Sequence, residues 1–149
     1  MKVNEIMASP AITVGESTSL EDVARLMLDK GIGCVPVVDA DGIIAGIVTE
    51  ASFAAKSKGI PFSTFRAPQL LGRWLSDTSV ANIYAEARQT PVSEIMVKNV
   101  VTIEEDESVN RAVELMLEHD INRIPVVRDG KPVGIVARHD LLRLMAGRV

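Results

Sequence analysis

The side chains that could do chemistry are few and scattered in this chain. It holds one cysteine, Cys34, and two histidines, His119 and His139. A lone cysteine excludes an internal disulfide, and these three residues form no cluster at metal-ligand spacing. No Ser/His/Asp or Cys/His constellation and no glycine-rich phosphate loop occurs. The residues therefore give no support for an enzyme or a metal site. Turnover of added ATP by this chain would be needed to support an enzyme.

The bulk composition is that of an ordinary soluble α/β protein. Of 149 residues, 47% are hydrophobic, 24% are charged and only 3% are aromatic, so the core must be built from aliphatic side chains. The net charge is -4 and no basic run occurs, which disfavours nucleic acid as a partner. Neither a signal peptide nor 18 consecutive apolar residues occur. We expect a cytoplasmic protein that has no membrane partner.

The chain contains an internal duplication, which is the strongest signal in the sequence. Residues 3–38 align with 92–127, and 41–53 align with 129–141 after one residue is dropped at Ala40. With Asp39 paired to Arg128, 19 of 50 aligned positions are identical.

Each repeat predicts the order β-α-β-β-α. Short β-prone runs at 11–14 and 100–103 precede residues of the helix-capping type at 16–19 and 105–108, which include Ser19 and Ser108, and apolar stripes at helical spacing follow. These stripes predict core positions, namely Leu20, Val23, Ala24, Met27 and Leu28, with Val109, Ala112, Val113, Met116 and Leu117 in the second copy. Hairpins are predicted at 34–48 and 123–136, and second helices near Glu50 and Arg138.

The predicted fold class is α/β, of the α+β type, with two tandem repeats. A unit of about fifty residues has too little core to be stable alone. The two repeats, residues 1–57 and 91–149, should therefore pack sheet against sheet about a pseudo-twofold axis. Residues 58–90 form an insertion between them.

The motifs of the two repeats together resemble the CBS-domain family. They are Glu-Ile-Met at 5–7 and 94–96, a threonine in the first strand, Pro-Val-Val at 36–38 and 125–127, an Asp-Gly turn, and Gly-Ile-Val at 46–48 and 134–136. The resemblance implies a CBS pair, or Bateman module, that commonly dimerises. It also implies a regulatory ligand that contains adenosine, such as AMP, ADP, ATP or S-adenosylmethionine, held in clefts between the repeats, and no cofactor.

The family's ligand signature, Gly-apolar-apolar-Thr/Ser-x-x-Asp, is divided between the two repeats. The first repeat keeps Thr49 but has Ser52 in place of the acid, whereas the second keeps Asp140 but has Ala137 in place of the hydroxyl. A carboxylate suits a ribose because it accepts hydrogen bonds from both vicinal hydroxyls. By the family's geometry, the predicted ligand-binding residues are Thr13, Ile32, Gly33, Cys34, Val35, Ala137, Arg138 and Asp140. The mirror cleft, expected to be weaker or empty, would consist of Thr49, Ser52, Thr102, Asn122, Arg123 and Ile124.

Simpler interpretations of the same residues stand beside this one. Asp140 could merely interact with the start of its helix, and Thr13 and Thr102 could simply be good strand residues. Arg123 and Arg138 are phosphate candidates that could equally be solvated surface residues. If neither cleft binds a ligand, the chain would be a scaffold that uses the fold only to dimerise.

The insertion has a different composition from the repeats. It holds four of the five aromatic residues and the helix expected at 80–88, with Thr78 or Ser79 as its cap. It is too apolar for a disordered linker. We expect it to cover apolar surface of the module or of its dimer mate, or else to dock a separate protein partner through Arg73 and Trp74.

Overall fold

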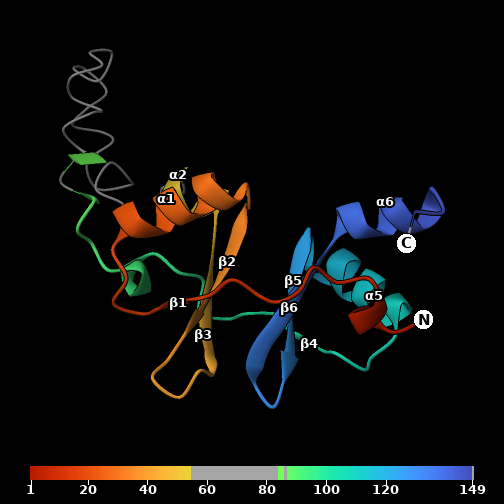
Figure 1. Cartoon of the computed structure of the whole chain (residues 1–149). Coiled ribbons are helices and arrows are strands. Elements are labelled where there is room, and N and C mark those ends of the chain that lie inside the picture. Colours follow the sequence, from red (N-terminus) through yellow and green to blue (C-terminus); the bar gives the residue numbers. More distant parts are fainter. Residues whose placement is uncertain (55–83, 86, 149) are drawn as a thin grey trace.

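The computed structural model describes residues 1–54, 84–85 and 87–148, and they form two three-stranded sheets with flanking helices (Figure 1). The first repeat consists of a 3-10 turn at Val3–Glu5, β1 (Val14–Gly15), α1 (Leu20–Lys30), β2 (Cys34–Val38), β3 (Ile44–Thr49) and α2 (Glu50–Ala54). The second consists of a 3-10 turn at Val92–Glu94, β4 (Ile103–Glu104), α5 (Val109–His119), β5 (Arg123–Arg128), β6 (Lys131–Ala137) and α6 (Arg138–Met145).

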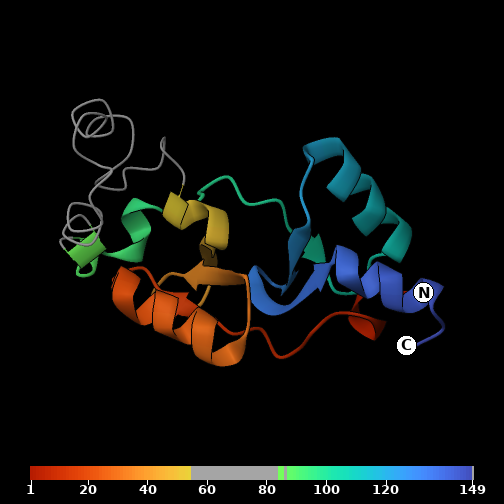
Figure 2. The same ribbon diagram turned by 90° about the horizontal axis from the view of Figure 1, so that it is seen from above.

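The two sheets have the same topology, as the duplication predicts. In the first, the order is β1-β2-β3, with β1 parallel and β3 antiparallel to β2, and the second repeats this order as β4-β5-β6. Their hairpins lie next to each other at the middle of the molecule, with α1 and α2 beside the first sheet and α5 and α6 beside the second (Figures 1 and 2). The hairpins are joined where the Ile44 N–H donates to the Gly130 carbonyl at 3.0 Å.

The predicted capping residues begin the long helices. Ser19 Oγ accepts the Asp22 N–H at 3.2 Å, and Ser108 Oγ accepts the Arg111 N–H at the same distance. The apolar stripes are mostly buried, but the prediction is wrong for Leu28 and Leu117, whose exposed fractions are 81% and 72%. Each lies at the edge of its stripe, next to a buried methionine, Met27 or Met116.

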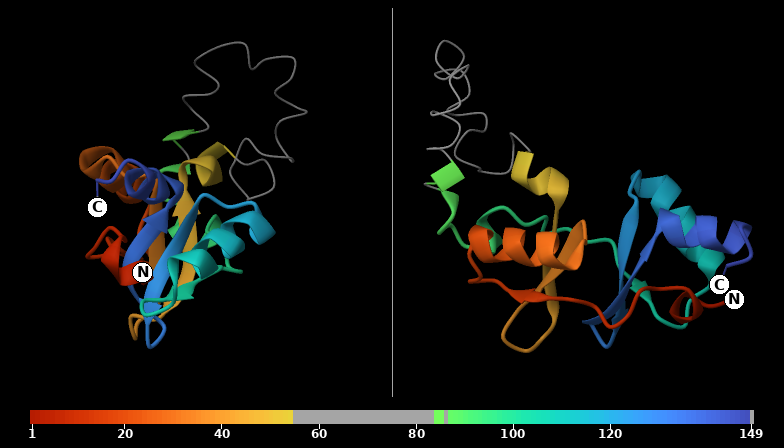
Figure 3. Two further views of the ribbon diagram at one scale, coloured as in Figure 1. Left: turned by 90° about the vertical axis from the view of Figure 1, so that its right-hand side faces the viewer. Right: turned by 45° about the horizontal axis from the view of Figure 1, so that its top comes forward.

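The segment that opens each repeat packs into the core of the other repeat. Val3 and Ile6 belong to the cluster built on α5, β5 and β6, whereas Val92 and Ile95 belong to the cluster built on α1, β2 and β3. Backbone bonds hold the exchange in place, because the Val3 N–H donates to the Glu107 carbonyl at 2.9 Å. The right-hand view of Figure 3 shows the N-terminal segment running from the second repeat to the first.

This exchange corrects the predicted first strands. Of the predicted runs 11–14 and 100–103, only Val14 and Ile103 pair with their own sheets, together with the next residues, Gly15 and Glu104. The preceding residues bond to the other repeat instead: the N–H groups of Ala8 and Ala11 donate to the carbonyls of Ile135 and Val133. One strand cannot extend along its own sheet while its backbone is paired elsewhere.

The glycine of each Gly-Ile-Val motif is required where the exchanged segment crosses a strand. A Cβ added to Gly134 would lie 2.6 Å from Met7 Sδ and 2.8 Å from the Ala8 carbonyl oxygen. A Cβ on Gly46 would lie 2.5 Å from Met96 Sδ and 3.0 Å from the Val97 carbonyl oxygen.

We therefore expect Gly134→Ala and Gly46→Ala each to lower the free energy of unfolding by roughly 1–3 kcal/mol, as overpacking does. Urea denaturation measures this loss. Gly15→Ala is the control, because a Cβ at Gly15 would meet nothing within 4 Å. Equal stability of the Gly134 and Gly15 variants would contradict the close approach.

The predicted roles of the insertion fall largely outside the described residues. Arg73, Trp74 and most of the helix expected at 80–88 lie there. The described part consists of 84–85 and 87–90, where the Arg88 N–H donates to the Tyr84 carbonyl at 3.1 Å, which is a helical contact. Whether the insertion covers the module or docks a partner stays a prediction.

Candidate functional site

A cleft of about 290 Å³ lies between the repeats at the position predicted for the ligand, and we call it the first cleft. Its size is near the lower end for small-molecule pockets. Four stretches build it: the N-terminal segment before β1, the end of α1 with the start of β2, the start of β5, and the junction of β6 with α6. The lining residues are Ala8, Pro10, Ala11, Ile12, Gly31, Ile32, Gly33, Cys34, Arg123, Ile135, Ala137, His139 and Asp140.

Asp140 is the buried acid of the first cleft, with an exposed fraction of 8%. Its Oδ2 accepts the Ala137 N–H at 2.7 Å, so the carboxylate caps the start of α6, as the simpler interpretation expected. Its Oδ1 lies 3.6 Å from Arg143 Nη1, too far for a good hydrogen bond. Because each carboxylate oxygen accepts two bonds, Asp140 keeps capacity to accept a ligand hydroxyl while it caps the helix.

The structure brings five of the eight predicted residues together in the first cleft: Ile32, Gly33, Cys34, Ala137 and Asp140. The other three do not line it. Val35 is fully buried in the core of its repeat, because successive side chains of a strand point to opposite faces. Arg138 is directed to Asp120, with 4.0 Å between the charged atoms, and Thr13 is exposed beside the cleft.

A second cleft of about 490 Å³ lies at the mirror position. It is lined by Ile47, Thr49, Glu50, Ala51, Val97, Asn99, Val100, Val101, Asp120, Ile121, Asn122, Arg123 and Pro125. Three of the six predicted residues, Thr49, Asn122 and Arg123, are among them. Ile124 and Ser52 are buried, and Ser52 Oγ accepts the Thr49 N–H at 3.0 Å, as Asp140 does in the other repeat.

Sequence reasoning missed the carboxylates of the second cleft. It was expected to lack a ribose acid, yet Glu50 and Asp120 line it. The alignment of the repeats could have revealed these two carboxylates, because Glu50 aligns with Arg138 and Asp120 aligns with Gly31. The two clefts therefore lie at equivalent positions but differ in volume and in charge.

Arg123 and Cys34, which occupy the same position in the two repeats, lie close together between the clefts. Arg123 lines both clefts, and its Nη2 would be 2.9 Å from a Cβ added to Gly33. Cys34 is 5% exposed, and this burial raises the pKa of its thiol to about 12, although the Arg123 charge acts in the opposite direction. Cys34 is therefore an inert structural thiol.

We expect Cys34 in the folded protein to react with iodoacetamide at pH 8 roughly a thousandfold more slowly than in urea, because the thiolate is the reacting form. Its pKa is raised to about 12 from 9.0, so a smaller fraction is ionised. Mass spectrometry of the alkylated protein measures the rate. Equal rates in the folded and unfolded protein would contradict the burial of Cys34.

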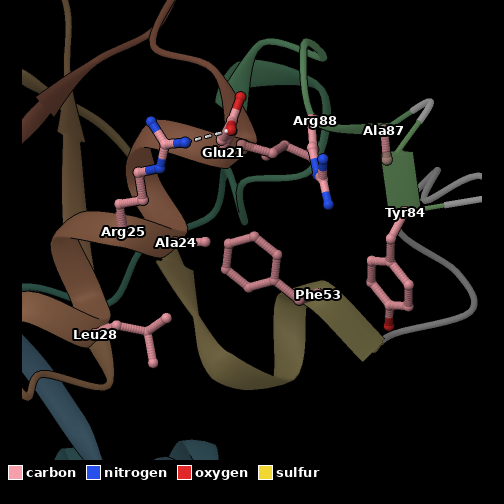
Figure 4. Close-up of a pocket in the computed structure, with 9 residues that line it drawn as sticks. Glu21, Ala24, Arg25, Leu28, Phe53, Tyr84, Ala87 and Arg88 are labelled. Atoms are coloured by element: carbon pink, nitrogen blue, oxygen red, sulfur yellow. Dashed lines mark hydrogen bonds and ion pairs between the residues drawn. The ribbon is translucent and has the colours of Figure 1, made fainter. Parts of the chain in front are cut away.

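A third hollow, of about 400 Å³, is separate from both clefts. Figure 4 shows Phe53 from α2 and Tyr84 beside it, with Ala24 and Leu28 contributed by α1. The Glu21–Arg25 ion pair, at 2.7 Å, lies at its edge. None of the predicted ligand residues contributes to it.

Within residues 1–54, 84–85 and 87–148, no group of three or more histidine, cysteine, aspartate or glutamate side chains could hold a metal ion. No helix in these ranges is long and apolar enough to cross a bilayer.

Comparison with solved structures shows the same architecture in known proteins. The CBS domain of a CBS domain-containing membrane protein from Sphaerobacter thermophilus is 41% identical, with a TM-score of 0.76, over 97% of this chain and 87% of that one. The CBS domain pair of protein MJ0100, in complex with 5′-methylthioadenosine and S-adenosyl-L-methionine, is 27% identical, with a TM-score of 0.72, over 100% of this chain and 98% of that one.

Sequence comparisons identify the family. An L-aspartate semialdehyde sulfurtransferase of Methanocaldococcus jannaschii is 29% identical over 98% of this chain, which spans only 23% of that enzyme's length. The family model described as the CBS domain matches residues 3–58 and again 92–147. With two matched repeats that together cover most of its length, the chain belongs to the CBS-domain family and forms a CBS domain pair.

Proposed function

We propose that this CBS pair is a regulatory module that binds an adenine nucleotide or S-adenosylmethionine in the first cleft. The observation that carries the proposal is the buried carboxylate of Asp140 in a cleft whose other lining residues, apart from Arg123 and His139, are small or apolar. The complex of the related MJ0100 pair with two adenosine compounds supports the ligand class.

The lining suggests how such a ligand would be held. Ala11, Ile12 and Gly33 offer flat apolar and backbone surface to an adenine ring. Asp140 would accept hydrogen bonds from the ribose hydroxyls, and Arg123 would meet a phosphate as a charge-assisted donor. Arg138 needs only to leave its long contact with Asp120 to approach the same phosphate.

The mechanism we propose is binding alone, without catalysis. The first cleft combines residues of both repeats, so a ligand there contacts two bodies at once. A ligand that binds one arrangement of the repeats more tightly shifts the population toward it, and a protein partner could read that change.

We also propose that a second copy covers exposed apolar residues of the helices. Leu28, Leu117, Leu142 and Met145 are 66–89% exposed and lie on α1, α5 and α6. Such residues favour a homodimer, because water contact with them is unfavourable.

Replacing Leu142 and Met145 together by aspartate should convert the dimer to a monomer, since a charge buried without a partner is costly. Light scattering coupled to gel filtration measures the mass. Arg148→Asp, close by on an exposed residue, is the control. A wild-type monomer of 16.1 kDa at every concentration would contradict the dimer.

A dimerisation scaffold without a ligand is the second candidate. It is favoured by the incomplete signatures: Asp140 already accepts the Ala137 N–H, and Ser52 takes the place of an acid in the first repeat.

Thermal unfolding of the full chain with AMP, ADP, ATP, S-adenosylmethionine and 5′-methylthioadenosine distinguishes the two candidates. A compound at 100 times its dissociation constant adds about 2.7 kcal/mol, which raises the midpoint by roughly 5–10 °C. Guanosine monophosphate is the control. No rise with any adenosine compound would leave the scaffold as the function.

A further inference from the structure

The two clefts share a single positive charge. Among the described residues that line either cleft, Arg123 is the only lysine or arginine, and it lines both. Its position in the first repeat is taken by Cys34, whose thiol is neutral and buried. Two clefts at equivalent positions therefore lie beside one guanidinium. Two identical repeats would have a guanidinium at both positions.

The surroundings of Arg123 leave its guanidinium between the clefts. Its Nη2 and the Oε1 of Glu50 would lie 2.9 Å and 3.0 Å from a Cβ on Gly33, so both side chains end over the backbone of that residue. Gly33 lines the first cleft, and Glu50 lines the second. The absence of a side chain at Gly33 is what lets Arg123 reach across, because a Cβ there would displace its end.

Because acidic residues line both clefts, binding of a ligand phosphate depends on the positive charge of Arg123. Asp140 lines the first cleft, and Glu50 and Asp120 line the second. Without Arg123, the lining residues would offer a phosphate in either cleft no cationic lysine or arginine, and their carboxylates would repel it at short range unless Arg138 left Asp120. A nucleoside without phosphate escapes this repulsion, and carboxylates favour it because they accept bonds from its hydroxyls.

We propose that Arg123 is the phosphate-selecting residue of both clefts, so that one chain holds a single phosphorylated nucleotide while it accepts unphosphorylated adenosine in both. The inference rests on the proposed function. When a phosphate in one cleft binds the Arg123 guanidinium, that positive charge is no longer available to the other cleft. The other cleft then binds only a neutral or cationic adenosine compound.

Calorimetric titration of the full chain with AMP and with adenosine tests this inference. We expect one AMP and two adenosine molecules to bind per chain. Arg123→Gln should weaken AMP binding roughly tenfold or more, the effect of losing a charge-assisted hydrogen bond, and should leave adenosine within about twofold. Arg128→Gln, on the same strand but in neither cleft, should bind both compounds as the wild type does.

The outcomes separate this inference from the proposed function. Two equal and independent AMP sites, one adenosine site, or unchanged AMP affinity in Arg123→Gln would each overturn the sharing of Arg123 while nucleotide binding stands. Binding of neither compound to the wild type would overturn the inference, and if ATP and S-adenosylmethionine also fail to bind, it would overturn the proposed function as well.

Discussion

Truncating Ile95 to alanine should lower the free energy of unfolding by about 2–5 kcal/mol, the usual cost of emptying a core position. Ile95 opens the second repeat in sequence, yet it is 1% exposed within the core of the first repeat, beside Val35 and Val48. The damage should therefore appear in the first sheet. Urea denaturation measures the total loss, and hydrogen exchange at the amides of β2 and β3 locates it.

Lys98→Ala is the matched control, because this exposed residue follows Ile95 in the same segment and should change the stability by less than about 0.5 kcal/mol. Ile6→Ala provides the reciprocal case, since Ile6 packs against α5 and β6. Loss of protection in β5 and β6 for the Ile95 variant would contradict the exchange of opening segments.

Replacing Asp140 by alanine should weaken nucleotide binding by roughly 10- to 150-fold, which corresponds to a hydrogen bond to a charged group worth about 1.5–3 kcal/mol. The variant should also lose about 1 kcal/mol of stability, because Asp140 caps α6. The affinity is measured by calorimetric titration with the adenosine compound that raises the thermal unfolding midpoint most.

Ser52→Ala separates the two roles of Asp140. It removes the equivalent cap of α2, which accepts the Thr49 N–H, and Ser52 does not line the first cleft. We expect a similar loss of stability with unchanged affinity. If Ser52→Ala and Asp140→Ala weaken binding equally, Asp140 acts only through folding.

The repeated elements could be predicted from the sequence because each has a local signal. Ser19 and Ser108 are the N-caps of α1 and α5, and Cys34–Val38 is a strand with the predicted bounds. The exchange of opening segments could not be predicted from such signals. The apolar residues at 3, 6, 92 and 95 are predicted to be buried. Their spacing does not indicate which of the two repeats contributes the core that buries them.

The site was predicted in part, for a similar reason. The motif that ends in Asp140 led to the first cleft, and adjacent residues such as Gly33 and Cys34 line it. Val35 does not line the cleft, because neighbouring side chains in a strand alternate between two faces. The position of Arg123 between both clefts depends on the packing of the repeats, which no local pattern encodes.

Ligand binding in the first cleft is tested most directly by amide chemical-shift mapping of the full chain as AMP, and in a separate titration S-adenosylmethionine, is added up to one equivalent. We expect the shifts to concentrate at residues 8–12, 31–34 and 135–140, which surround the first cleft, and at Arg123. Shifts confined to the hollow beside Phe53 and Tyr84, or no shifts at all, would contradict this expectation.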